Sequence, residues 1–209
     1  MITPRPLDPA PPGGSSPRRV WYASYGSNMR LERLAVYLRG GRPAGAARSC
    51  PGCRDTTLPV RSVPVELAGR MYFATRSPVW GGGRAFYDPG AAGRVLARAH
   101  LVTAQQFADI AAQEMYREPG GELDLSGVLT TGRAVLGPGR YETLVCAGRL
   151  DGAPVLTFTA PWSMDEVPWA PPAPAYLRLL AAGLGEAGAW TGEEIAAYLA
   201  GCPGADGRP

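Results

Sequence analysis

Residues 20–38 read VWYASYGSNMRLERLAVYL. The first six residues are β-branched, aromatic or small, which is typical of a buried strand. The run stops at Gly26-Ser27-Asn28, and apolar residues then recur at the spacing of one helix face, at Leu31, Leu34, Ala35 and Leu38. This stretch therefore predicts a strand, a tight turn and a helix.

The turn at Gly26-Ser27-Asn28 suits a small anion such as a carboxylate. A strand-to-helix turn presents backbone N–H groups and the positive end of the helix dipole. Glycine lets a ligand approach the backbone closely, and Ser27 or Asn28 can either cap the helix or donate to a ligand. Helix capping alone also explains these residues, and the spacings of dinucleotide- and phosphate-binding loops are not present.

A second helix is predicted from Thr103 to about Tyr116, because Thr103 offers a capping box with Gln106. One side of this helix is an apolar stripe and the other is polar; the stripe holds Phe107, Ile110 and Ala111, and the polar side holds Gln105, Gln106, Asp109 and Gln113. Glu114 falls within the apolar stripe. Desolvation is expected to raise the pKa of its carboxyl toward the range of a general acid or base. Two alternatives stay open, an exposed helix end and a pairing with an arginine.

The remaining pattern predicts an α+β domain, with its sheet closed into a small barrel as one form of that fold. Residues 56–101 are strand-like around a loop at Gly81-Gly82-Gly83, and Asp151-Gly152 is a hairpin signal between strands at about 141–150 and 155–159. Helices are expected at 175–184 and 193–199, the latter after a capping box of Thr191 and Glu194. We expect one domain over residues 20–200, with disordered tails at 1–19 and 201–209.

Composition excludes several classes of protein. The chain has 209 residues and a net charge of +3, and its basic residues are all arginine, because the sequence contains no lysine. The arginines are spread along the chain, so nucleic-acid binding is not expected. No apolar run reaches the ~18 residues of a membrane span, and residues 1–19 lack the apolar core of a signal peptide. We therefore expect a cytoplasmic protein that binds no membrane.

The four cysteines and the single histidine do not form a metal-binding pattern. Cys50 and Cys53 have the spacing of half a zinc site or a redox dithiol, but no second pair follows and His100 is distant in sequence. We expect a reduced pair in a surface turn, with His100 in a structural role and no bound metal.

Tyr25-Gly26-Ser27-Asn28-Met29, after a hydrophobic strand, resembles the Tyr-Gly-Ser-Asn-Leu/Met motif of the gamma-glutamyl cyclotransferase-like family. Residues 110–114 are similar to the family's Leu-Asp-x-x-Glu-Gly segment. Residues 174–188 are similar to its Pro-Ser-x-x-Tyr, Gly-Ala and Glu-x-Gly-Leu segment, so the resemblance runs in order over about residues 20–200. The chain departs from the family at three positions, where Asp, Gly and often Tyr are replaced by Ala111, Met115 and Phe158.

The resemblance implies a mixed β-barrel or sheet with flanking helices, and an enzyme of transferase or lyase type. Such an enzyme releases 5-oxoproline and an amine from a γ-glutamyl amide or peptide without a cofactor or metal. Glu114 is then the catalytic acid/base, and the substrate is bound by Tyr25, Gly26, Ser27 and Asn28. Further candidate pocket residues are Trp80, Gly82 and Tyr141.

Other readings of the same residues stay open. Residues 80–84 either form a loop that selects the leaving amine or an ordinary glycine-rich turn. The whole chain is either a cyclotransferase, a binding module of the same fold that has lost turnover, or an enzyme for another acyl or amide transfer in the same pocket. In each case the expected partner is a small molecule, and the oligomeric state is left open.

Overall fold

The computed structural model describes residues 2–9, 17–42, 49–78 and 80–206. In chain order the elements are β1 (Arg19–Ser24), η1 (Ser27–Met29), α1 (Leu31–Arg39), β2 (Ser62–Ala68), β3 (Arg70–Arg76), β4 (Gly83–Asp88), β5 (Arg94–Thr103), α2 (Ala104–Glu114), α3 (Ser126–Thr131), β6 (Arg133–Val135), β7 (Thr143–Leu150), β8 (Ala153–Thr159), η2 (Met164–Glu166), α4 (Pro174–Ala187) and α5 (Gly192–Ala200). The strands come in runs, β2 to β5 and β6 to β8, with helices between and after them, which matches the expected α+β class.

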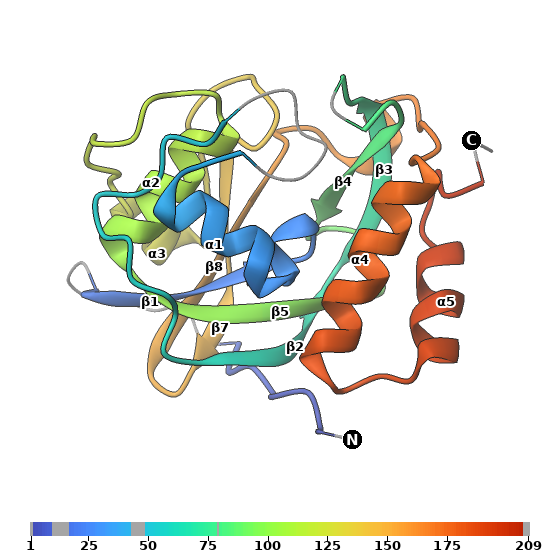
Figure 1. Cartoon of the computed structure of the whole chain (residues 1–209), viewed down its shortest axis with the longest axis horizontal. Coiled ribbons are helices and arrows are strands. Elements are labelled where there is room, and N and C mark those ends of the chain that lie inside the picture. Colours follow the sequence, from blue (N-terminus) through green and yellow to red (C-terminus); the bar gives the residue numbers. More distant parts are fainter. Residues whose placement is uncertain (1, 10–16, 43–48, 79, 207–209) are drawn as a thin grey trace.

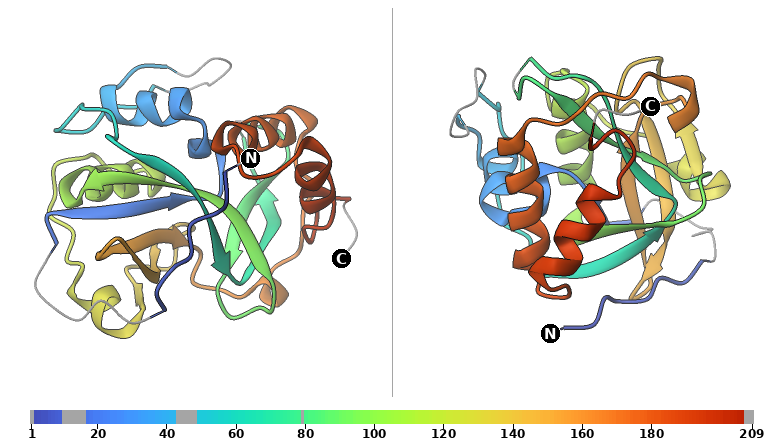
Figure 2. Two further views of the ribbon diagram at one scale, coloured as in Figure 1. Left: turned by 90° about the horizontal axis from the view of Figure 1, so that it is seen from below. Right: turned by 90° about the vertical axis from the view of Figure 1, so that its right-hand side faces the viewer.

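A six-stranded mixed sheet in the order β2-β5-β1-β8-β7-β6 carries the fold. The strand β1 lies inside the sheet, antiparallel to β5 and parallel to β8. Alternate residues of β1 enter different cores: Trp21 packs with α4 and α5, whereas Tyr22 packs with α1, α2 and α3. Figure 1 shows α4 and α5 side by side along one side of the molecule, and the views of Figure 2 place them away from α2 and α3. The end of β1 therefore emerges between two helical layers.

The expectation of a closed barrel is wrong. Among the described residues the main sheet is open, with β2 and β6 at its edges, and β3 and β4 form a separate two-stranded sheet. Gly69 connects β2 to β3 at φ +123, and a Cβ there would lie 2.5 Å from the carbonyl oxygen of Asp88. Only glycine fits this sharp change of direction, after which β3 pairs with β4 outside the main sheet.

Both chain ends differ from the disordered tails expected at 1–19 and 201–209. Ile2 donates from its backbone to Gly188, Arg5 donates to Pro64 at the β2 edge, and Asp8 donates to Arg149 on β7. At the other end, the backbone N–H of Phe73 donates to Pro203 at 2.8 Å. Exposed edges of the two sheets supply unpaired backbone groups, and the terminal segments satisfy them. Residues 10–16 and 207–209 lie outside the described part of the chain.

Local signals predicted most elements correctly. The capping boxes at Thr103 and Thr191 are both present, and the β7–β8 hairpin turns at Asp151 and Gly152, which lie at φ +49 and +80. The strand β4 and the short α3 and β6 are the elements that local patterns miss. The helix α3 and the strand β6 are only six and three residues long, and β4 starts within the glycine-rich segment that reads locally as a loop.

Candidate active site

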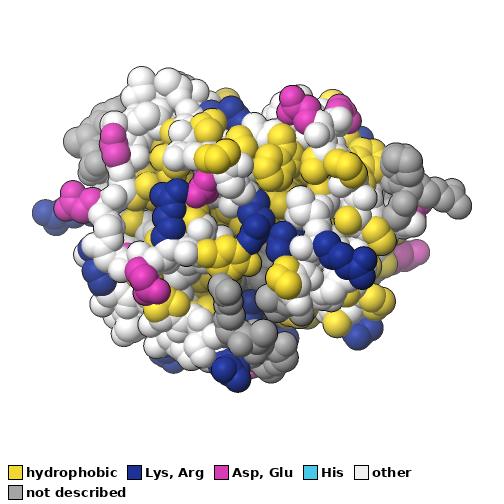
Figure 3. Space-filling view, turned by 90° about the horizontal axis from the view of Figure 1, so that it is seen from above, with side chains coloured by type: hydrophobic (Ala, Val, Ile, Leu, Met, Phe, Trp, Pro, Cys, Tyr) yellow, Lys and Arg dark blue, Asp and Glu magenta, His cyan; other side chains and the backbone are white. Residues whose placement is uncertain are grey.

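A cavity of about 650 Å³ lies where the end of β1 meets α1, the end of α2 and the loops before β4 and β7. Figure 3 looks onto the face to which these loops project. Hydrophobic side chains and arginines gather around its middle, with an acidic side chain between basic ones. Seven of the predicted site residues line this cavity: Tyr25, Gly26, Ser27, Asn28, Trp80, Glu114 and Tyr141.

Gly82 is the predicted pocket residue that does not line the cavity. A Cβ at Gly82 would lie 2.4 Å from the backbone nitrogen of Ala173, and one at Gly83 would lie 1.9 Å from the carbonyl oxygen of Ala170. These two glycines therefore face the 170–173 segment, where they permit close backbone packing. The expected contact of Gly82 with the pocket is wrong, although Trp80 just before it does reach the cavity.

The turn after β1 differs in detail from the sequence expectation. Gly26 is extended and leads into η1, and α1 begins only at Leu31. Neither Ser27 nor Asn28 caps a helix through its side chain, so the capping explanation does not hold. Within the described residues, the backbone N–H groups of Ser27 and Asn28 have no hydrogen-bond partner. The turn therefore offers unpaired donors to the cavity without the dipole of a long helix.

Asn28 connects this turn to Glu114. Its side-chain Nδ2 donates to Glu114 Oε1 at 3.3 Å and lies 3.4 Å from the hydroxyl of Tyr22. Asn28 is 2% exposed, and its Oδ1 has no partner in the described chain. One buried amide thus joins the turn to the carboxylate and leaves an acceptor unused at the cavity wall.

Glu114 is the last residue of α2 and is partly buried at the cavity wall. Burial raises the pKa of its carboxyl above the ordinary value. Hydrogen bonding from Tyr37 and Asn28 and the positive charge of Arg33 partly offset that rise. No arginine of the described part of the chain lies within 4 Å of the carboxylate, so none of these arginines forms an ion pair with Glu114.

His100, on β5, contacts the backbone of the turn, and this is a structural role of the kind expected for it. It is fully buried on β5, and its Nε2 lies 3.1 Å from the carbonyl oxygen of Asn28 while its Nδ1 lies 2.8 Å from Ser62 Oγ. Burial lowers the pKa of His100 to about 3, so the ring is neutral at physiological pH.

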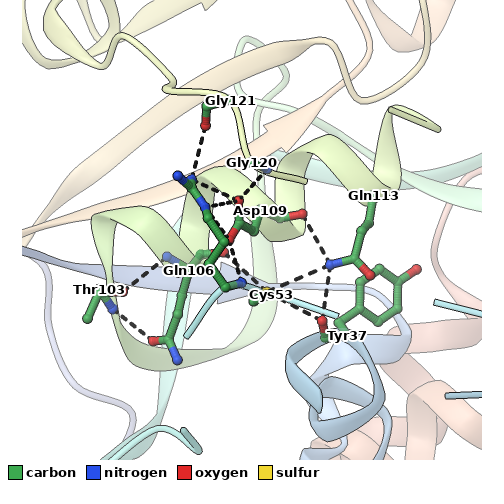
Figure 4. A network of polar contacts seen from close by, with 9 residues as sticks. Tyr37, Cys53, Thr103, Gln106, Asp109, Gln113, Gly120 and Gly121 are labelled. Carbon is green, nitrogen blue, oxygen red and sulfur yellow. Dashed lines mark hydrogen bonds and ion pairs between the residues drawn. The ribbon is translucent and has the colours of Figure 1, made fainter. Parts of the chain in front are cut away.

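On the side of α2 opposite the apolar stripe, the polar residues Gln106, Asp109 and Gln113 are also buried. Figure 4 shows their polar contacts. Asp109 is fully buried and accepts from the backbone N–H groups of Arg54 and Gly120, at 2.9 and 3.2 Å, and from the Arg54 guanidinium at 3.0 Å. Gln113 Nε2 donates to the carbonyl oxygen of Tyr37 at 3.0 Å. This network holds the end of α2 against α1 and sets the position of Tyr37 beside Glu114.

Comparisons with known proteins point to one fold. No family model matches the chain. A solved structure of a gamma-glutamyl cyclotransferase aligns with a TM-score of 0.52 and 16% identity, over 86% of this chain and 88% of that one. The chain has the gamma-glutamyl cyclotransferase fold. A solved structure of an uncharacterized human protein has the same fold, with a TM-score of 0.53 and 16% identity, over 87% of this chain and 89% of that one.

One curated protein is similar in sequence as well. Histone deacetylase 5 of Arabidopsis thaliana is 34% identical over an alignment of 200 residues that covers 86% of this chain. The chain spans only 30% of that protein's length. That name belongs to a much longer protein, and this chain matches only a part of it.

The cavity of this cyclotransferase fold also contains residues that the sequence motifs did not indicate. They are the tyrosines Tyr22, Tyr37 and Tyr176 and the arginines Arg33, Arg84 and Arg140. The spacing of Arg33 and Tyr37, four apart on one helix face, was an available signal. Arg84 and Arg140 reach the cavity from β4 and from the loop before β7, and only the tertiary fold brings them together.

Of the described cysteines, Cys50 lines the cavity. Among residues 2–9, 17–42, 49–78 and 80–206, no group of three His, Cys, Asp or Glu side chains could hold a metal ion. The four cysteines are free, as expected. Cys53 is buried, contrary to the expected surface turn, and burial raises the pKa of its thiol to about 12. A search of the same described residues finds no helix that could cross a membrane.

Proposed function

We propose that the chain is an enzyme that converts a γ-glutamyl amide or peptide into 5-oxoproline and a free amine, with Glu114 as general acid and base. The observation that carries this proposal is the Glu114 carboxylate, which lies in the cavity wall and accepts a hydrogen bond from Asn28 of the turn. A partly desolvated carboxylate beside unpaired backbone donors suits a substrate that carries a carboxylate and an ammonium group.

The reaction needs no nucleophile from the enzyme. Glu114 takes a proton from the substrate's α-ammonium, and the freed amine attacks the γ-carbonyl carbon to form the lactam C–N bond. Glu114 gives this proton to the leaving nitrogen, and the C–N bond to that nitrogen breaks. The carboxylate then takes the second proton from the ring nitrogen and passes it to the released amine, which leaves as an ammonium ion. Because the attack is intramolecular, most of the gain comes from holding the glutamyl chain folded, which Gly26, Ser27 and Asn28 do from one side.

Other side chains around the cavity form its fixed walls or orient the Glu114 carboxylate. Tyr25 donates its hydroxyl to the carbonyl oxygen of Phe158 at 2.9 Å, so it serves as a fixed wall. Tyr141 is held in the same way by the carbonyl oxygen of Ala85 at 2.9 Å. Tyr37 and Asn28 stay hydrogen-bonded to the carboxylate and orient it toward the turn.

The purified chain should release 5-oxoproline from at least one member of a panel of γ-glutamyl amines, amino acids and peptides. Chromatographic detection of 5-oxoproline and of the free amine in equal amounts would support the proposal. A chain that binds panel members in calorimetry yet releases no product at high enzyme concentration is a binding module, and the proposal is then wrong.

The pH dependence of kcat/KM should show an acid limb that is caused by the ionisation of Glu114. Only the carboxylate form accepts the first proton, so kcat/KM should rise with pH as this group ionises. The pKa of Glu114 is raised by burial, so the acid limb should lie at higher pH than an ordinary glutamate would produce. Initial rates between pH 4 and 8 measure this limb. A profile that is flat in this range, or one whose limb lies at the ordinary glutamate value, contradicts the assignment.

A further inference from the structure

Arg84 is a buried cation without an acidic partner in the described chain. It is 9% exposed at the start of β4 and lines the cavity. Its Nη1 donates to Thr75 Oγ1 at 3.0 Å, and this is its hydrogen bond to a described residue. Thr75 lies at φ +51 in a β-bulge of β3, which turns the strand opposite Arg84. A guanidinium has five donors, so most of those of Arg84 remain for a ligand.

Arg98 is a mostly buried arginine that, unlike Arg84, is paired with an acidic side chain. Its side chain is 12% exposed, and its Nη1 lies 2.9 Å from both Glu186 Oε2 and the carbonyl oxygen of Met29. A buried charge is expensive unless it is paired and hydrogen-bonded. Arg98 meets this requirement within the chain, whereas Arg84 meets it only in part.

Arg140 adds a second positive charge to the same region. It stacks over the ring of Tyr116 at 4.6 Å, and it has no acidic side chain within 4 Å in the described residues. Burial and the charge of Arg140 both lower the pKa of Arg84. Arg140 also lowers the pKa of Glu114, so it lies within electrostatic reach of both residues. Two like charges beside one cavity are most stable when an anion lies between them.

We propose that Arg84 and Arg140 form an anion subsite for the leaving half of the substrate, and that this half carries a carboxylate or phosphate group. The inference rests on the proposed function, since it assigns the second part of the same cavity. The glutamyl half occupies the turn and Glu114, and the anion at the far end of the leaving amine is held by the two guanidinium groups. Neutral and cationic leaving amines are then poor substrates.

Three probes test the subsite. They share the γ-glutamyl half and differ in the leaving amine: γ-glutamyl-alanine carries a carboxylate, γ-glutamyl-phosphoethanolamine a phosphate, and γ-glutamyl-ethylamine no charge. The kcat/KM for the better anionic probe should exceed that for the ethylamine by about 10- to 100-fold, the usual scale of a charge-assisted hydrogen bond. The anionic probe with the higher kcat/KM shows whether the subsite prefers a carboxylate or a phosphate. Equal values for all three overturn the proposal.

Arg84→Gln should lower the ratio of kcat/KM for the better anionic probe to kcat/KM for the ethylamine to about one, whatever its effect on the absolute rates. Arg140→Gln should do the same more weakly, and it keeps the test informative if Arg84→Gln does not fold, because Arg140 is partly exposed. Arg178→Gln, an exposed arginine on α4, is the matched control and should keep the full preference. An anion preference that survives both cavity substitutions contradicts the subsite.

Calorimetric binding separates this inference from the proposed function. If no probe releases 5-oxoproline, the proposed function is wrong, but the subsite still predicts tighter binding of an anionic probe than of the ethylamine. Arg84→Gln should abolish that difference. Equal binding of the three probes to the wild-type chain overturns the subsite, whatever the outcome of the turnover assay.

Discussion

Glu114→Gln is expected to lower kcat for the preferred γ-glutamyl substrate by about 10²–10⁴-fold, the scale of general acid–base catalysis. The amide keeps the size of the side chain, and its oxygen can still accept from Asn28, 3.3 Å away in the wild type. It cannot take the proton of the α-ammonium. Substrate binding should therefore change much less than kcat. A stopped or continuous assay for 5-oxoproline measures the effect.

The same substitution should not lower stability at neutral pH. Burial raises the folded-state pKa of Glu114, so the folded chain favours its protonated form. The stability that this group contributes is present at acid pH and is lost as pH rises through the raised pKa. A neutral glutamine escapes that loss, and thermal unfolding at pH 5 and pH 8 should show a smaller decrease for Glu114→Gln than for the wild type.

Glu193→Gln is the matched control, because Glu193 is exposed in the first turn of α5. It should change neither kcat nor the pH dependence of unfolding. Near-wild-type turnover by a folded Glu114→Gln chain would remove Glu114 from the mechanism. A loss of activity shared by both variants would also count against the assignment.

Asp109→Asn should lower the free energy of unfolding by about 1–3 kcal/mol, as expected when a buried backbone donor loses its acceptor. Both carboxylate oxygens of Asp109 accept from backbone N–H groups, those of Arg54 and Gly120 (Figure 4). An asparagine must direct its NH₂ group at one of these donors. It also loses the charge that faces the Arg54 guanidinium at 3.0 Å.

Urea unfolding followed by circular dichroism measures this effect, with Asp165→Asn as the control. Asp165 is exposed in η2, and its substitution should stay within about 0.5 kcal/mol of the wild type. Because the Asp109 network anchors the helix that carries Glu114, Asp109→Asn should also reduce kcat. A variant with wild-type stability would show that this network does not hold α2 in place.

Local patterns were most informative where one element could be considered alone. The helix of residues 104–114 and its capping box follow from sequence spacing, and the position of Glu114 on the stripe with Ile110 follows from the same helical period. The strand before Gly26 and the hairpin at Asp151-Gly152 are equally local. These features depend on interactions between residues only a few positions apart.

Other features could not be predicted in this way. The polar residues of α2 were assigned to the opposite face, but their burial depends on residues 53–57 and 120–121, which close over that face. The turn was expected to lead directly into a helix, but η1 intervenes, because its residues pack against α4 from the far end of the chain. Gly82 reads locally as a permissive loop residue, and its contact with Ala173 is about ninety positions away in sequence.

The amino-acid sequence by itself determined the strand, the turn residues Gly26, Ser27 and Asn28, and an acidic residue on the apolar stripe of a helix, because backbone propensity and helical period are local properties. Only the tertiary structure decided that Asn28 meets Glu114, that the sheet stays open, and that Arg84 and Arg140 share the same cavity. Asn28 and Glu114 are 86 positions apart and Arg84 and Arg140 are 56, so each pair comes together only once the sheet has assembled the ends of its strands and the adjoining loops.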